Sequence, residues 1–197
     1  MNDIDLSTWG NWKPIGGDWQ QESSNFSGIF DGNGYSIFNM TITEESAYSG
    51  SYAGLFTVIR GATVKNIEAI TGRITSQGKA ALCAGAVCSE AIDSEIINCT
   101  SYIDVSYQFG EPTGDVIWTS LNVYCTVGGI AGTISGTTIE NCCNFGDVSG
   151  ISHPATMNLG GITAKYSNDS KVANCYNAGS LAANTDFATA EVGGIVG

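Results

Sequence analysis

The sequence has little positive charge. Seven Lys and Arg residues stand against nineteen Asp and Glu residues in a chain of 197, which gives a formal net charge of -12. Surfaces that bind nucleic acid or anionic membranes need clustered basic residues, and those of this chain are scattered. No apolar run approaches the roughly 20 residues of a membrane span. We therefore expect neither a nucleic-acid partner nor insertion into a membrane.

Histidine is scarcer still, with one residue in the whole chain. The seven cysteines do not form a metal-binding pattern either, because Cys83 and Cys88 are five positions apart, Cys142 and Cys143 are adjacent, and neither spacing fits a zinc site. The stretch FDGNGYS over 30–36 lacks the alternating acids of an EF-hand, so we interpret it as a tight Asn-Gly turn. No cofactor is expected from these residues.

Helical patterns are missing as well. No window keeps a 3.6-residue apolar period, and three prolines accompany 26 glycines without a Gly-X-Y repeat. The apolar stretches are short and end at Gly, Asn, Asp or Ser, as strands joined by turns do. With 43% hydrophobic residues the chain can bury a core. We expect a single all-β domain over residues 1–197.

Two short motifs recur along the chain. The first is a small residue followed by Gly and an aliphatic residue, and the second, aliphatic-x-Asn-apolar, follows it by 12 or 13 positions. Asn66, Asn98, Asn141 and Asn174 are spaced by 32, 43 and 33 positions, the length of a solenoid turn rather than of a domain. Parallel stacking of such turns places equivalent residues about 4.8 Å apart around an apolar interior. The repeat predicts a parallel β-helix with turns of roughly 30 residues.

The second motif predicts two stacked columns of side chains. Its Asn position forms a ladder of amides that hydrogen-bond from turn to turn at a corner of the coil. The next position holds Met, Ile or Cys, so a free cysteine there serves as a small apolar side chain and no disulfide is required. Cys143 has no repeat equivalent and is the first thiol to test for exposure or bridging. The ladder comprises Asn39, Asn66, Asn98, Asn141 and Asn174, and the buried column comprises Met40, Ile67, Cys99, Cys142 and Cys175.

The two ends of the chain differ from the repeats. Residues 1–40 carry three of the four tryptophans and are expected to form an N-terminal cap and the first strands, with repeat turns over 41–197. The final letters, VGGIVG, open a turn without completing it, and an uncapped solenoid exposes strand edges. We therefore expect a fragment of a longer protein, with end-to-end self-association as a third hypothesis for its role.

With these motifs on view, the chain resembles the GLUG-repeat family of bacterial surface proteins. The tetrapeptides GIAG at 129–132 and GIVG at 194–197 are similar to the Gly-Leu-x-Gly motif, with Ile in the Leu place, whereas the copies at 54–57, 85–88 and 161–164 depart at the last Gly. The resemblance covers nearly the whole chain and implies a right-handed parallel β-helix, as in adhesins and immunoglobulin A protease-like proteins. It also implies a secreted or cell-surface location, although the start of the chain shows no export signal. The metallopeptidase motif HExxH is absent, and one His cannot form that zinc site.

The register also brings two carboxylates together. Asp104 and Asp147 both lie five positions beyond the cysteine column, with Ser180 next in line. On adjacent turns about 5 Å apart, the pair suits the acid and nucleophile of a retaining glycosidase, or a Ca²⁺ ion. A lyase would also need a neighbouring cation, and Arg73 is interpreted as one residue out of register. We favour two solvated, outward-facing side chains.

The turn after Asn98 is about ten residues longer than its neighbours. The excess falls within the insertion at 107–125, which offers aromatic side chains that either stack on sugar rings or pack against the coil: Tyr107, Phe109, Trp118 and Tyr124. We expect a non-catalytic extracellular scaffold or adhesin module that presents this insertion to a glycan or a host surface protein. The alternative is a β-helix polysaccharide lyase or glycoside hydrolase with Asp104 and Asp147 as its catalytic residues.

Overall fold

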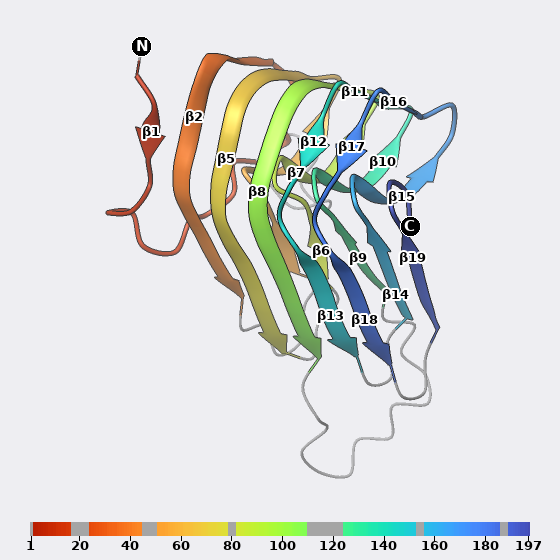
Figure 1. Ribbon diagram of the computed structural model, residues 1–197. Coiled ribbons are helices and arrows are strands. Elements are labelled where there is room, and N and C mark those ends of the chain that lie inside the picture. The colour runs from red at the N-terminus through yellow and green to blue at the C-terminus, as the bar shows by residue number, and fades with distance from the viewer. Residues whose placement is uncertain are drawn as a thin grey trace.

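The chain folds as a parallel β-solenoid of about five turns. A computed structural model describes residues 2–16, 24–44, 51–78, 82–109, 124–152, 156–185 and 189–197. In Figure 1 the chain runs down the front of the molecule, returns behind it and advances from the N-terminal side toward the C-terminal side, which makes the coil right-handed. Over the described ranges the structure contains strands and turns, and no helix that could cross a membrane. The predicted fold class is confirmed.

Three parallel sheets form the walls of the coil, and strands inside each sheet pair with their equivalents one turn earlier and one turn later. The long sheet contains β1 (Ile4–Asp5), β2 (Ile29–Glu44), β5 (Thr63–Gly78), β8 (Glu95–Phe109), β11 (Thr138–Glu140), β12 (Cys143–Asn144), β13 (Val148–Ser152), β16 (Lys171–Ala173), β17 (Tyr176–Asn177) and β18 (Leu181–Thr185). The four-stranded sheet contains β4 (Phe56–Arg60), β7 (Cys88–Ile92), β10 (Ala131–Ser135) and β15 (Thr163–Ser167). The five-stranded sheet contains β3 (Ser51–Ala53), β6 (Leu82–Ala84), β9 (Tyr124–Gly128), β14 (Thr156–Gly160) and β19 (Ala190–Gly193).

Asparagines turn the corner within the long sheet. Asn66, Asn98, Asn141 and Asn174 all have positive φ angles, between 53° and 58°. Among residues with a Cβ, Asn is one of the few that adopt this left-handed conformation readily, because its short amide bonds to the nearby backbone. The corner bends β5 and β8 within one continuous strand, and in the later turns it separates β11 from β12 and β16 from β17.

The first turn departs from the predicted register. Ile37 lies opposite Ile70, and Met40 lies opposite Gly72 rather than Ile67, so Met40 is buried outside the predicted column. Asn39 donates its amide to Asp5 and does not belong to the ladder of the later turns. The predictions for Asn39 and Met40 were therefore wrong.

The corner of the first turn lies at a bulge in β2, ahead of Asn39. Asp31 pairs with Lys65 and Tyr35 pairs with Ile67, so three residues of β2 stand where β5 has only Asn66. Among those three, Asn33 has a positive φ of 51° and makes the turn. Asn33 lies between two glycines and lacks the motif aliphatic-x-Asn-apolar, which occurs six positions later at Asn39, so the sequence pattern selected the wrong asparagine.

The N-terminal segment lies over the first turn. β1 pairs with β2, and single bridges join Asn11 to Thr41, Ile15 to Phe56 and Phe26 to Ile59. Residues 2–16 and 24–28 thereby pair with the edges that β2 and β4 would otherwise expose. An edge that is already paired cannot recruit a strand from another molecule.

Free thiols fill part of the interior. Cys99 and Cys142 are fully buried above Ile67, Cys175 is half-buried in the last of these turns, and all seven cysteines are unpaired. Each of the three stacked thiols donates to a backbone carbonyl two positions earlier, at 3.2 to 3.4 Å. The thiols thus pack as small side chains while satisfying corner carbonyls.

A second row of polar residues, not predicted from the sequence, crosses the core two positions beyond the cysteine column. Asn144 is fully buried; its amide donates to Gly146 O at 2.8 Å and to Asn177 Oδ1 at 2.9 Å. The earlier turn has Ser101 at the same level, paired with Asn144.

The opposite wall compensates for the size of these side chains. A Cβ placed on Gly129 would collide with the Asn144 side chain, and a Cβ on Gly161 would collide with that of Asn177. In the turn with the smaller Ser101, the position equivalent to Gly129 is Ala86, since Ala84 pairs with Val127 and Cys88 with Ala131. The recurrent Gly-Gly step therefore makes room for a buried amide.

Candidate binding face on the long sheet

The outer face of the long sheet carries exposed polar and aromatic side chains that could contact a ligand. Along β8, Tyr102, Asp104, Ser106 and Gln108 are exposed, while the residues between them point into the core. This two-residue alternation is the pleat of a strand with one buried face. Equivalent positions on β5 and on the later turns extend these residues into columns that run parallel to the axis of the coil.

One column is charged and contains both predicted carboxylates. Arg73 pairs with Asp104, and the Asp147 backbone N–H donates to Asp104 Oδ1 at 3.0 Å. Ser180 N in turn donates to Asp147 Oδ1 at 2.8 Å. Arg73 is in register with Asp104, contrary to the prediction, because β5 has an irregularity between Ile67 and Ile70 that shifts the pairing by one residue.

The hydrogen bonds of these carboxylates define what they can do. The backbone and hydroxyl of Ser180 lower the pKa of Asp147, since both stabilise the ionised form. The general acid of a glycosidase needs the opposite, a carboxyl whose pKa is raised so that it stays protonated. Asp147 is exposed and accepts a bond from the next turn, so it acts as a structural acceptor between turns.

A second column is aromatic and was not predicted from the sequence. Tyr102 and Phe145 stack with ring centroids 5.0 Å apart and planes 12° from parallel, and Tyr176 meets Phe145 edge-on at 6.1 Å. All three rings are about half exposed. Tyr102 and Phe145 both lie three positions beyond the cysteine column, the same register that pointed to the aspartates. The stacked faces cover each other, so the rings stabilise the contact between turns and present mainly their edges to solvent.

A groove of about 640 Å³ lies beside the charged column. Its floor follows a column of small side chains in register, which stand between taller side chains on both sides. These small residues are Thr43, Thr75, Ser106, Ser149 and Ala182. Arg73 borders the groove on one side, and Gln108, Ile151 and Asn184 border it on the other. The groove therefore crosses five consecutive turns along the helix axis.

The aromatic residues proposed for ligand binding do not gather at one site. Tyr107 is 2% exposed and packs in the core, because it follows Ile103 and Val105 on the inward face of β8. Tyr124 is exposed at the start of β9, on a different sheet. Trp118 and the side chain of Phe109 lie outside the described residues. The prediction that Tyr107 is a surface ligand contact was wrong.

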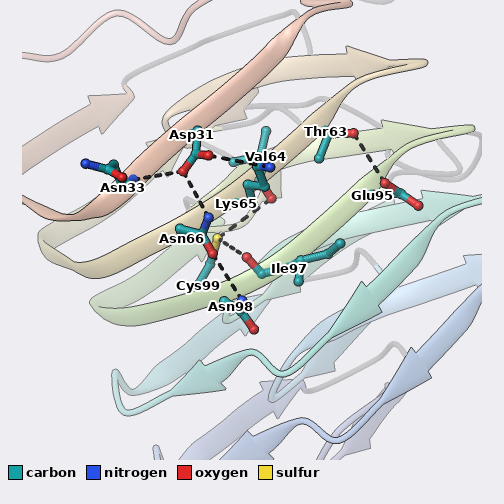
Figure 2. Close-up of polar contacts among 10 residues, drawn as sticks. All are labelled: Asp31, Asn33, Thr63, Val64, Lys65, Asn66, Glu95, Ile97, Asn98 and Cys99. Atoms are coloured by element: carbon teal, nitrogen blue, oxygen red, sulfur yellow. Dashed lines mark hydrogen bonds and ion pairs between the residues drawn. The ribbon is translucent and has the colours of Figure 1, made fainter.

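The corner of the coil carries a polar ladder, drawn in Figure 2. Asn98 Nδ2 donates to Asn66 Oδ1 at 3.0 Å, and Asn66 Nδ2 donates to Asp31 Oδ1 at 3.0 Å. Lys65 Nζ lies 3.5 Å from the other oxygen of Asp31. Each amide thus donates toward the N-terminal side, and a carboxylate ends the series. The Asn66 amide, then the Asn33 backbone N–H, lower the pKa of Asp31.

This ladder predicts a pH effect on stability. Because the pKa of Asp31 is lower in the folded than in the unfolded chain, its contribution is present above the unfolded pKa of about 3.9 and is lost as pH falls through the folded value. Asp31→Asn is expected to flatten the fall in unfolding free energy below about pH 4. Urea unfolding at several pH values measures this. Glu68→Gln, on the same exposed corner without a hydrogen bond among the described residues, is the control.

An unchanged acid profile in Asp31→Asn, matching that of Glu68→Gln, would show that the carboxylate at the end of the ladder does not contribute in this way.

The described residues contain no group of three His, Cys, Asp or Glu side chains that could hold a metal ion. Burial raises the pKa of the Cys83 thiol to about 11, and the pKa values of Cys88 and Cys125 are raised for the same reason. A thiol with a raised pKa stays protonated near neutral pH and is a poor nucleophile. These three cysteines therefore have the properties of core residues.

Comparison with known proteins gives a structural likeness. No protein-family model matches the chain, and no curated protein matches it. A solved structure of a candidate immunoglobulin A1 protease from Bacteroides ovatus is similar, with a TM-score of 0.54 and 21% sequence identity. The match covers 92% of this chain and 59% of that one, so the chain spans less than two thirds of its structural neighbour. At this identity the likeness shows a common fold, and the GLUG resemblance rests on its motifs alone.

Proposed function

We propose that the chain is a non-catalytic scaffold module of a secreted or surface-attached bacterial protein, which binds a glycan or a host surface protein on the outer face of its long sheet. The observation that carries the proposal is the use of Asp104 and Asp147 as acceptors for backbone N–H groups of the following turns. Carboxylates held in this way maintain the spacing of turns. The bonds from Ser180 also lower the pKa of Asp147, which disfavours the protonated form that a general acid needs.

The architecture supports a scaffold role. Parallel pairing continues through all three sheets, and the interior is filled by fully buried aliphatic and sulfur side chains. Such a coil keeps surface columns at fixed positions, so groups on its outer face need no ordering when a partner binds. The structural neighbour from Bacteroides ovatus shows that this fold occurs in a bacterial protein named as a candidate protease. The present chain has one His in its whole sequence and no HExxH.

Binding and glycan cleavage, measured together, test the proposal. The chain is expected to bind glycans or host glycoproteins on an array without releasing reducing ends. Asp104→Asn combined with Asp147→Asn is expected to leave cleavage at background. Asp169→Asn, an exposed carboxylate beside the four-stranded sheet, is the control for lost charge.

Cleavage that occurs with the original chain and disappears in the double variant, with binding kept, would establish the hydrolase or lyase instead. Sizes measured over a range of concentrations in the same samples would reveal end-to-end self-association, and absence of all binding would overturn the proposal.

A further inference from the structure

We infer that the groove beside Arg73 is the binding site of a neutral, linear glycan that lies parallel to the helix axis. This inference rests on the proposed function and specifies where the ligand binds and what it is. The groove crosses five turns. Four intervals of about 4.8 Å give a length of about 19 Å, which suits a short oligosaccharide segment. The small floor residues leave room for a chain to lie along them, because the side chains on either side are taller.

The chemistry of the lining favours a polyhydroxylated ligand. Thr75 and Ser106 bring hydroxyl groups to the floor, and Gln108 brings an amide to the rim. Each of these groups both donates and accepts, as sugar hydroxyls do.

Arg73 gives the groove a directional contact. Its guanidinium makes no hydrogen bond or ion pair with any described residue, although it stands in a chain of net charge -12. A guanidinium has five N–H donors in a fixed geometry, and its bonds to sugar oxygens would be charge-assisted. Among the described groove residues, it is the one that carries a charge.

The surrounding charge argues for a neutral chain. Asp104 and Asp147 continue the column of Arg73 on the next two turns, and both are exposed. A polyuronate laid along this column would place its carboxylates beside those of the protein, and like charges at such distances repel. A neutral glycan can instead donate its hydroxyls to the same aspartates. Binding should then change little with salt.

Titration calorimetry with soluble neutral polysaccharides (a linear β-glucan, a xylan and a galactomannan) and with polygalacturonate tests this inference. At least one neutral chain is expected to bind, with an affinity that is similar at low and high salt. Ser106→Trp places a large side chain on the exposed floor and is expected to weaken binding by at least tenfold. Arg73→Ala is expected to weaken it by about tenfold, the value of one charge-assisted hydrogen bond.

Matched controls on the four-stranded sheet keep the test specific. Ser167→Trp adds the same bulk and Lys165→Ala removes the same charge, both at exposed positions of β15. Each is expected to bind as the original chain does, and thermal unfolding of all four variants checks that they fold. Unchanged binding in both folded groove variants, or a preference for polygalacturonate, would overturn the groove assignment.

If the chain binds host proteins on the array but none of the neutral polysaccharides, the groove inference fails while the proposed scaffold function stands. Loss of every kind of binding would instead count against the proposed function itself.

Discussion

Replacing Gly129 with alanine is expected to lower the free energy of unfolding by about 3 kcal/mol, because the new methyl group would overpack the core. The Cβ would collide with the Asn144 side chain and with the backbone carbonyl of Gly161 on the next turn. Movement of the Asn144 side chain can relieve the first contact, whereas the second requires a shift of the stacked backbone, which disturbs its hydrogen bonds. Urea unfolding, with the m-value checked for two-state behaviour, measures the loss.

The chain offers an internal control and a rescue for Gly129→Ala. Gly194 holds the same motif position two turns later and has open space around its Cα, so Gly194→Ala is expected to cost less than about 0.5 kcal/mol. Adding Asn144→Ser to Gly129→Ala recreates the Ala86 and Ser101 combination of the earlier turn. The free energy of unfolding of the double variant should exceed, by about 1 kcal/mol or more, the value obtained by adding the losses of the two single variants. Strict additivity would contradict the steric coupling.

Asn144→Ala is the second substitution with a large expected effect, a loss of about 3 kcal/mol in unfolding free energy. The buried amide donates to Gly146 O and to Asn177 Oδ1, and its oxygen accepts from Gly146 N at 3.3 Å. Alanine would leave these partners without hydrogen bonds in the interior, where each unsatisfied group costs about 1–3 kcal/mol. Chemical denaturation measures the loss.

Asn141→Gly serves as the comparison for Asn144→Ala. Asn141 is an exposed corner residue with a φ of 55°, a conformation that glycine adopts freely, and its side chain makes no hydrogen bond with the described residues. Asn141→Gly is expected to lower the free energy of unfolding by less than about 1 kcal/mol. If both substitutions lower the free energy of unfolding by the same amount, the hydrogen bonds of the buried Asn144 amide do not stabilise the fold as proposed.

The repeat and the fold could be predicted from the sequence because two independent motifs kept a constant separation. At the corners that contain Asn98 and Asn141, equivalent residues pair as the motifs imply, even though the turn between the two asparagines is longer than its neighbours. The failures came where a strand carries an irregularity. In β2 the corner lies at the bulge around Asn33 and not at Asn39, and the irregularity in β5 brought Arg73 opposite Asp104. Periodicity cannot place a bulge, because one inserted residue changes the register without changing the composition.

The candidate site was predicted only in part. Counting from the cysteine column found Asp104 and Asp147, and the same count at position three would have found Tyr102 and Phe145. Tyr107 was assigned to the surface as part of the insertion, yet the alternation of β8 already placed it on the inward face. The groove could not be predicted from any motif, since it arises from the relative heights of neighbouring columns.

The complementarity between Gly129 and Asn144, and between Gly161 and Asn177, joins residues within a single turn. Each of these turns therefore contains both the glycine and the buried asparagine that it accommodates, separated by about 15 residues of sequence. Duplication of one complete turn, or exchange of whole turns between related genes, preserves that match, whereas a crossover between the glycine and its asparagine would break it. Lengthening of such a rod during evolution is thus expected to proceed by whole coils, with recombination boundaries outside the segment from the Gly-Gly step to the buried amide.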